Sequence, residues 1–496
     1  MKIKISILIL FLLVHNSIVC QINDERLSNL DKDIEFLVGK YNALGLAVAI
    51  VERDSIIYSK GFGFRNREKK LAMNSETLLP IGSATKSFTS TVLGILENQG
   101  YPSLEEKPLK YIPNLEFFNS EMNHLITIED LLCHKSGMGS FDGSNTFFPT
   151  KQPEDFIPRL KHLKPNGEIK NSFIYSNVGY GLVGLIIQNI SGETWEATID
   201  SIIFEPLNMK RSVTNIQDME KDQNHGIGYG LSKGSQVKLM NRNYTFSKAE
   251  GAVISSVNEM SKYLIAWLND GEYKGKQVIP RDYIRQASSI KNIIPPNNED
   301  SIRKINGYGY GWFIQNQKGH YKVQHGGNVP GFSTQMATFP NEKIGIIVIT
   351  NQNNSALPYF VEDVITNRMF NLPQKPIEEY EVRVSEIWNS VRKVKSQNNK
   401  QKPTHDLKEY CGTYTEKGHG TINIRTEGEF LYIKFPEYEF ILEHRNFNNF
   451  VMANTYEIPE VFGLPFFGLS FKIGFDGNID ALFLEIQSEP VKFVKQ

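Results

Sequence analysis

The length and charge of the chain limit what the protein can be. Its 496 residues are many for a single hydrophobic core, so at least two domains are expected. Its 54 Lys and Arg residues balance 55 Asp and Glu residues, and no basic stripe with interleaved aromatic residues occurs. Nucleic acid is therefore not expected as a partner.

The first twenty residues have the pattern of a secretory leader. Lys2 and Lys4 form a positive start, and residues 5–14 are apolar apart from one serine, a stretch too short to span a bilayer. Cleavage after Cys20 leaves Gln21 first, and acylation of Cys20 is the less favoured alternative. The pattern predicts an exported protein, periplasmic or extracellular.

Two cysteines, Cys133 and Cys411, follow the predicted cleavage point. They are far apart in sequence, so no disulfide framework is expected. No later segment is apolar for long enough to anchor the chain in a membrane.

Strand signals occur at both ends of the first 370 residues, and helical signals lie between them. In chain order the predicted strands are 46–51 and 56–58 at one end and 310–314, 321–324, 334–339 and 344–350 at the other, and the predicted helices are 86–99, 128–134, 178–190 and 256–268. Thr127 and Asp130 form a predicted capping box for the second helix. This order predicts one antiparallel sheet flanked by helices, with a helical subdomain beside it and a site between the two.

The composition changes after residue 372. Residues 373–404 are expected to be a helical segment and a linker, and residues 405–496, in which short strands alternate with turn residues, a small all-β domain. The first domain is expected to span 21–372.

Ser83-Ala84-Thr85-Lys86 is the first of three patterns that suggest chemistry. Positions i and i+3 of a helix lie roughly 5–6 Å apart, so the Lys86 amine can reach the Ser83 hydroxyl and act as its base. Among five Ser-x-x-Lys tetrads, this is the one that opens an apolar-faced helix after an extended approach; the others are Ser235/Lys238, Ser288/Lys291, Ser301/Lys304 and Ser390/Lys393. A helix start also offers free backbone N–H groups, so the Ser83 N–H is a candidate oxyanion donor.

The other two patterns follow in sequence order. Tyr175 in Tyr-Ser-Asn can pass a proton between nucleophile and leaving group, and Asn177 can hold a substrate amide. In His325-Gly326-Gly327-Asn328 the glycines allow close approach of substrate to the backbone, so the Asn328 N–H is the second candidate oxyanion donor.

Together these motifs resemble the serine β-lactamase and penicillin-binding-protein superfamily, in its class C-related branch. Residues 126–138 are similar to that branch's T-I-x-D-L-L-x-H-x-S-G segment, residues 249–256 to its A-G-G-x-x-S-S, and the C-terminal domain to a lipocalin-like β domain of some members. The resemblance implies Ser83 as the acylated nucleophile, Lys86 and Tyr175 as the proton-transfer pair with the base unassigned, Asn177 as a substrate ligand and the strand of His325 as the wall that binds substrate. It implies no metal and no cofactor.

One departure narrows the expected substrate. Class C β-lactamases usually carry Lys-Thr-Gly on the third strand, whereas His325-Gly326-Gly327 looks more like the D-Ala-D-Ala carboxypeptidase, D-aminopeptidase and esterase members. The sequence therefore predicts a serine hydrolase for a small-molecule or peptide substrate, an amide or ester, ahead of an efficient β-lactamase. A non-catalytic sensor of cell-wall fragments is the alternative of another class. The oligomeric state is left open.

Three other patterns carry weaker hypotheses. Gly230-Leu231-Ser232-Lys233-Gly234 matches a nucleophile elbow but lacks a buried strand before it and a helix after it, so a loop is expected. The ten histidines show no zinc-hydrolase spacing, and His134 is expected to be structural. The loop 139–148, rich in Gly, Ser, Asn and Phe, is expected at the rim of the pocket.

Overall fold

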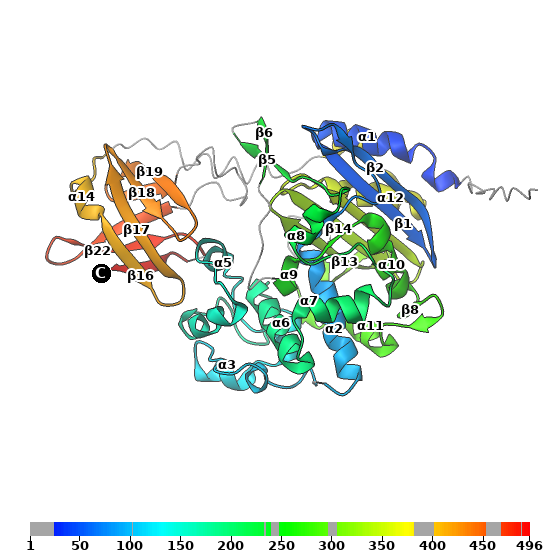
Figure 1. The fold of residues 1–496 in the computed structure, drawn as a ribbon, viewed down its shortest axis with the longest axis horizontal. Coiled ribbons are helices and arrows are strands. Elements are labelled where there is room, and N and C mark those ends of the chain that lie inside the picture. The colour runs from blue at the N-terminus through cyan, green and yellow to red at the C-terminus, as the bar shows by residue number, and fades with distance from the viewer. Residues whose placement is uncertain are drawn as a thin grey trace, which may run out of the picture.

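The computed structural model describes residues 24–101, 103–232, 235–239, 248–295, 305–380, 401–452, 468–487 and 489–496. The predicted leader, 1–20, and most of the predicted linker, 381–400, lie outside the described residues. Figure 1 shows a large domain of mixed sheet and helices and a separate β-barrel formed by the C-terminal part of the chain.

One nine-stranded sheet joins the two ends of the first domain, as the sequence predicted. Its order is β10-β11-β12-β13-β14-β15-β1-β2-β3, and β1 and β15 pair antiparallel with Val48 opposite Val348. The strands are β1 (Gly45–Glu52), β2 (Ser55–Asn66), β3 (Leu71–Ala72), β10 (Asn292–Ile293), β11 (Ile305–Tyr308), β12 (Phe313–Gln317), β13 (His320–Val329), β14 (Phe332–Phe339) and β15 (Ile344–Thr350).

Both faces of this sheet are covered, so its central strands are apolar on both sides. Along β1, alternate residues such as Val48 pack with α1 (Leu30–Lys40) and α12 (Leu357–Met369). The residues between them, such as Ala49, belong to the core shared with α2 (Thr85–Asn98) and α10 (Val257–Leu268). Successive side chains of β1 therefore point to opposite faces of the sheet, and each face packs on its own layer of helices.

The remaining helices form the subdomain beside the sheet. They are α3 (Ser120–Leu125), α4 (Ile128–Leu132), α5 (Asp142–Phe147), α6 (Asn177–Ser191), α7 (Trp195–Ile199), α8 (Ile216–Lys221), α9 (Lys248–Gly251) and α11 (Arg281–Ala287). The capping box of Thr127 and Asp130 is confirmed, because each side chain accepts a hydrogen bond from the other residue's backbone N–H. None of the described helices is both long and apolar enough to cross a membrane.

Several predicted element limits were wrong. The strand predicted at 310–314 begins at Phe313, because Gly311 takes a positive φ of 78° and turns the chain before it. The strand predicted to end at 324 continues through His325 and both glycines to Val329. The short strands β10 and β11 were not predicted, since two to four residues carry little periodic signal.

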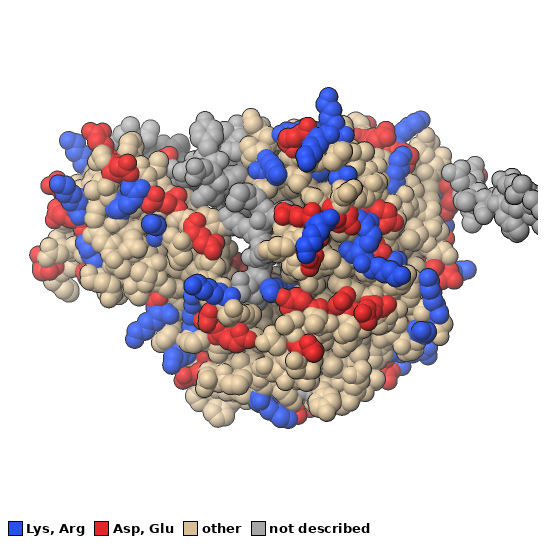
Figure 2. Space-filling view, in the orientation of Figure 1, with Lys and Arg blue, Asp and Glu red and all other residues tan. Residues whose placement is uncertain are grey.

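The C-terminal domain is a closed eight-stranded barrel, β16-β17-β18-β19-β20-β21-β22-β23, closed by pairing of β16 with β23. It follows the short helix α14 (Leu407–Tyr410), and its interior holds aromatic and aliphatic side chains. The strands are β16 (Gly412–Glu416), β17 (Gly420–Glu427), β18 (Phe430–Lys434), β19 (Glu439–Asn446), β20 (Asn449–Met452), β21 (Gly468–Ile473), β22 (Ile479–Leu484) and β23 (Val491–Lys495). On the face shown in Figure 2, basic and acidic side chains are interspersed over both domains.

A buried ion pair fixes β13 against α12. Lys322 Nζ lies 2.6 Å from Glu362 Oε2, and the two side chains are only 4% and 2% exposed. Replacing Lys322 by methionine would leave the Glu362 carboxylate buried without its cation, so we expect the free energy of unfolding to fall by about 3–5 kcal/mol. Urea denaturation measures this change.

Lys221→Met is the matched control for Lys322→Met. Lys221 pairs with Asp218 at the surface, where the two side chains are 77% and 43% exposed, and loss of such a pair costs at most about 1 kcal/mol. Equal stability losses in the two variants would contradict the role given to the buried pair.

Candidate functional site

The chain leads to Ser83 through a short extended segment that pairs with a neighbouring strand. Strand β4 (Leu79–Pro80) pairs with β7 (Ile254–Ser255), and the Ile81 N–H donates to the carbonyl of Val253 at 3.0 Å. A 3₁₀ turn (Gly82–Ala84) then presents Ser83 and leads into α2. The predicted serine–helix junction is therefore present, with Ser83 in the turn just before the helix.

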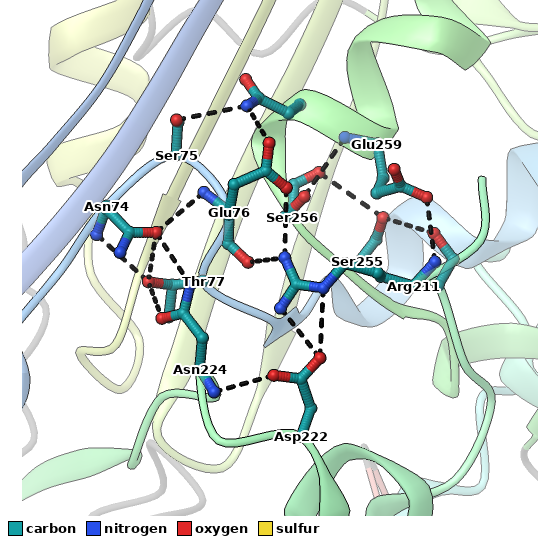
Figure 3. Close-up of polar contacts among 12 residues, drawn as sticks. Asn74, Ser75, Glu76, Thr77, Arg211, Asp222, Asn224, Ser255, Ser256 and Glu259 are labelled. Carbon is teal, nitrogen blue, oxygen red and sulfur yellow. Dashed lines mark hydrogen bonds and ion pairs between the residues drawn. The ribbon is translucent and has the colours of Figure 1, made fainter. Parts of the chain in front are cut away.

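A polar network supports the chain that enters this segment (Figure 3). The Arg211 guanidinium donates to the backbone carbonyl of Glu76 at 2.5 Å and to Asp222 Oδ2 at 2.8 Å. The Arg211 backbone N–H donates to Glu259 Oε2 at 3.1 Å, at the start of α10. No sequence motif had indicated this network, which joins segments more than a hundred residues apart.

The base predicted from the tetrad lies under the nucleophile. Lys86 Nζ is 3.1 Å from Ser83 Oγ and donates to the carbonyl of Glu250 at 3.2 Å. Lys86 is fully buried whereas Ser83 is partly exposed. Burial lowers the pKa of Lys86 to about 8, against the opposing effect of the Glu250 and Asp142 carboxylates. An amine with this pKa is partly neutral near pH 7 and can accept a proton.

Tyr175 lies beside Lys86 and Ser83. Its ring centroid is 5.0 Å from Lys86 Nζ, and its phenol lies close enough to Ser83 for that side chain to act on its pKa. Burial raises the pKa of Tyr175 above its ordinary value, with Ser83 opposing the shift. The phenol is thus protonated at neutral pH.

Asn177 begins α6, directly after Ser176, which is the N-cap of that helix. Its side-chain Nδ2 donates to Asp142 Oδ1 at 2.7 Å. Among the described residues, no donor bonds to Asn177 Oδ1. Asp142 lies in the predicted rim loop, but no sequence pattern had distinguished it there.

The two candidate oxyanion donors are brought together by glycines. A Cβ on Gly327 would lie 2.9 Å from the Ser83 backbone nitrogen, and a Cβ on Gly82 would lie 2.8 Å from the Asn328 backbone nitrogen. The strand β13 therefore packs directly against the Ser83 turn in a way that no larger residue permits. Gly82 also has a φ of 55°, which favours glycine.

His325 is buried, and both its nitrogens are bonded within the protein. Nδ1 lies 2.6 Å from the Gly326 carbonyl, so it carries the hydrogen, and Nε2 accepts from the Tyr308 hydroxyl at 2.9 Å. Burial lowers the pKa of His325 to about 3, helped by the charge of Lys86, so the ring is neutral. The imidazole lies beside Tyr175, at 6.3 Å between ring centroids.

His134 supports the same tyrosine from another side. Its Nδ1 accepts from the Ser176 backbone N–H at 3.0 Å, and its ring centroid is 4.4 Å from that of Tyr175. Burial holds the pKa of His134 well below its ordinary value, so this ring is also neutral.

Ser232, the serine of the Gly-x-Ser-x-Gly match, lacks the strand-to-helix turn that a nucleophile elbow requires. Residues Tyr229–Ser232 form β5, which pairs with β6 (Ser235–Lys238) in a two-stranded hairpin. The expectation of a loop was wrong for residues 230–232, which are strand, and the next described element is the strand β6, where an elbow requires a helix. Among the described residues, no three His, Cys, Asp or Glu side chains form a group that could hold a metal ion.

Comparison with known proteins decides the family. A family model described as Beta-lactamase matches residues 30–363. The chain belongs to the beta-lactamase family. A second model, described as Domain of unknown function (DUF3471), matches residues 396–495.

Two curated proteins are similar in sequence to this member of the beta-lactamase family. "Protein flp" of Staphylococcus aureus (strain N315) is 28% identical over 350 residues, 69% of this chain and 66% of that protein, so the match spans just under two thirds of flp. "Penicillin-binding protein 4*" of Bacillus subtilis (strain 168) is 24% identical over 423 residues, 80% of this chain and 85% of that protein.

Two solved structures share the fold. The octameric penicillin-binding protein homologue from Pyrococcus abyssi has a TM-score of 0.63 at 23% identity and covers 95% of this chain and 100% of its own. A D-stereospecific amidohydrolase from Streptomyces sp. has a TM-score of 0.57 at 18% identity and covers 70% of this chain and 99% of its own. The beta-lactamase-like sheet-and-helix fold followed by a barrel domain is thus shown.

Proposed function

We propose that the protein is an exported serine hydrolase that forms an acyl-enzyme at Ser83 and transfers the acyl group to water. The observation that carries the proposal is the buried Lys86 amine 3.1 Å from Ser83 Oγ, with a pKa lowered to about 8. Burying a lysine amine in this way costs stability, but it gives a catalytic base that is partly neutral near pH 7. The leader-like residues 1–20 support export to the periplasm or the exterior.

In the proposed first step, Ser83 Oγ attacks the substrate carbonyl and gives its proton to the neutral Lys86 amine. The backbone N–H groups of Ser83 and Asn328 donate to the oxygen that becomes negative. Tyr175, whose phenol is protonated, relays a proton to the leaving amine or alcohol as the carbonyl re-forms. Water then attacks the Ser83 ester by the same route and releases the acid.

The charges near the site favour a neutral or cationic substrate over an anionic one. The Glu250 and Asp142 carboxylates lie close enough to act on the pKa of Lys86, and His325, at the place of the lysine in Lys-Thr-Gly, is neutral. A substrate carboxylate would meet repulsion from the two acidic groups. We therefore propose peptides, D-amino-acid amides or small esters as substrates, ahead of β-lactams.

A substrate panel together with covalent labelling tests this proposal. We expect a fluorophosphonate probe to label the wild-type protein but not Ser83→Ala, and nitrophenyl esters or D-amino-acid amides to be hydrolysed with higher kcat/KM than nitrocefin. Nitrocefin as the best substrate would favour the alternative of a class C-like β-lactamase. A wild-type protein that neither labels nor turns over any panel member would favour a non-catalytic sensor of cell-wall fragments.

A further inference from the structure

The half-buried ring of Phe313 lies beside the tyrosine assigned to proton transfer. Its plane is within 3° of that of Tyr175, with 6.3 Å between the ring centroids, and its centroid is 5.1 Å from that of His325. The pairing of β12 with β13 reaches Phe313 and Gln324, one residue before His325. Phe313 therefore lies at the edge of the expected substrate wall, next to the reacting groups.

Phe313 differs in accessibility from other neighbours of the Tyr175 ring. Lys86, His134 and His325 also lie against this ring, and each is at most 1% exposed. Phe313 is partly exposed, as is Tyr175 itself. Among these four neighbours, Phe313 is thus the side chain that has surface left for a substrate.

A second phenylalanine extends this surface. The Phe173 ring is partly exposed, and its centroid is 6.3 Å from that of Phe313 and 5.8 Å from that of Tyr308. Tyr308 is fully buried and packs edge-on against Phe313 at 4.7 Å, so it supports both rings from inside the protein. Phe173 and Phe313 are called the phenylalanine pair below.

The titratable side chains around the phenylalanine pair are neutral at pH 7. Burial lowers the pKa of His325 to about 3 and holds the pKa of His134 well below its ordinary value. Burial also raises the pKa values of Tyr175 and Tyr308, so both phenols keep their protons. The Lys86 amine is neutral in its reactive form. A charged group placed here would lose its water without gaining an opposite charge from these residues.

The proposed mechanism decides which part of the substrate reaches this surface. Tyr175 gives a proton to the leaving amine or alcohol, so the leaving atom must come within hydrogen-bond reach of the phenol. The group attached to that atom then lies beside the accessible neighbour of Tyr175, the Phe313 ring. Such a ring packs favourably on apolar groups and on other aromatic rings.

We propose that the phenylalanine pair forms the leaving-group subsite and selects substrates whose leaving group is uncharged and apolar, above all an aromatic alcohol or amine. This inference rests on the proposed acyl-transfer function. It narrows the substrates to apolar or aryl esters and amides, and it disfavours carboxypeptidase action, in which the leaving amino acid carries a free carboxylate. Phe313 is then a specificity-determining residue that takes no part in proton transfer.

Three acetate esters test the proposal in the full-length protein. The leaving groups of para-carbamoylphenyl acetate and para-carboxyphenyl acetate have the same shape and differ in charge, and trifluoroethyl acetate has a small leaving group. Each kcat/KM is divided by the rate of hydroxide hydrolysis of the same ester, which removes differences in intrinsic reactivity. We expect the wild type to prefer the carbamoyl ester over the carboxy ester at least about tenfold.

Two substitutions of Phe313 change this selectivity in different ways. Phe313→Ala should lower kcat/KM for the carbamoyl ester about tenfold more than for trifluoroethyl acetate, because the aryl leaving group loses the larger contact. Phe313→Lys places a cation at the subsite, so the preference should shift about tenfold or more toward the carboxy ester. Circular dichroism checks folding, and Phe173→Lys makes the same charge test if Phe313→Lys does not fold.

Phe360→Ala and Phe360→Lys are the matched controls. Phe360 is also a partly exposed aromatic residue, but it lies in α12, where it packs on Tyr41 and Tyr380 on the other face of the sheet. Both control variants should keep the wild-type ratios among the three esters.

Three results would overturn the inference: a wild type without preference for the carbamoyl ester, an equal loss of both activities in Phe313→Ala, or an unchanged preference in the folded lysine variant. Each of these would leave the proposed function intact as long as a fluorophosphonate labels Ser83. Absence of labelling in the wild type would instead refute the proposed function itself.

Discussion

Replacing Ser83 with alanine is expected to lower kcat/KM for a nitrophenyl ester by at least about 10⁴-fold, because no acyl-enzyme can form. Lys86, Tyr175 and the two backbone donors remain in the variant, so any residual rate comes from water attack assisted by these groups. Steady-state ester hydrolysis measures the change. The Ser83 side chain is partly exposed, so the variant should keep the wild-type unfolding midpoint.

Ser232→Ala serves as the control for Ser83→Ala. Ser232 belongs to the rival Gly-x-Ser-x-Gly match, which lies in the hairpin of β5 and β6. Its replacement should change kcat/KM less than twofold. Activity retained in Ser83→Ala and lost in Ser232→Ala would reverse the choice of nucleophile.

Lys86→Met is expected to reduce activity and increase stability together. Loss of the general base should lower kcat/KM by about 10³- to 10⁴-fold. In the wild type the neutral amine is the reactive form, so kcat/KM should rise about tenfold per pH unit below pH 8 and level off above it, in line with the lowered pKa of about 8. A pH–rate profile measures this rise in kcat/KM below pH 8. The rise should be missing in Lys86→Met.

The stability effect of Lys86→Met follows from the same pKa. The folded-state pKa of about 8 lies below the ordinary value of 10.5, so below pH 8 folding must bury a charged amine at a cost of about 3 kcal/mol. This cost diminishes as the pH rises from 8 to 10.5, where the unfolded chain also loses the proton. Methionine, of similar length and without charge, should therefore raise the free energy of unfolding at pH 7 by up to about 3 kcal/mol.

Urea denaturation of the wild type and Lys86→Met at pH 7 and pH 10 checks this sign. The gain in stability should be large at pH 7 and small at pH 10. Lys110→Met, at a lysine whose side chain is 60% exposed, should show neither effect. A Lys86→Met variant that is less stable at pH 7, or that keeps the rise in kcat/KM below pH 8, would contradict the assignment of Lys86 as the base.

Patterns within a short stretch of chain predicted much of the fold and the centre of the site. The Lys86 amine reaches Ser83 because helical geometry sets the spacing of i and i+3, whatever the rest of the chain does. The strand signals at both ends of the domain predicted that these strands form one antiparallel sheet, and the structure joins the two ends through the pairing of β1 with β15.

Contacts between distant segments could not be predicted in this way. Asp142 looks like any loop acid in the sequence, and only the packing of α5 brings it to Asn177. The burial of Phe147 and Phe148 in the barrel depends on Phe435 and Phe493, which follow 288 and 345 positions later. His325 was predicted to line the substrate wall, but the burial and bonding of its ring depend on Tyr308, in a strand too short to recognise.

Trapping the acyl-enzyme tests the proposed chemistry most directly. The full-length protein would be mixed with an activated ester, quenched in acid during the pre-steady-state phase, digested and mapped by mass spectrometry. We predict the mass of the acyl group on the peptide that contains Ser83, and its absence in Ser83→Ala. An acyl group on another residue such as Ser232, or rapid turnover without any acylated peptide, would contradict the assignment of Ser83 as the nucleophile.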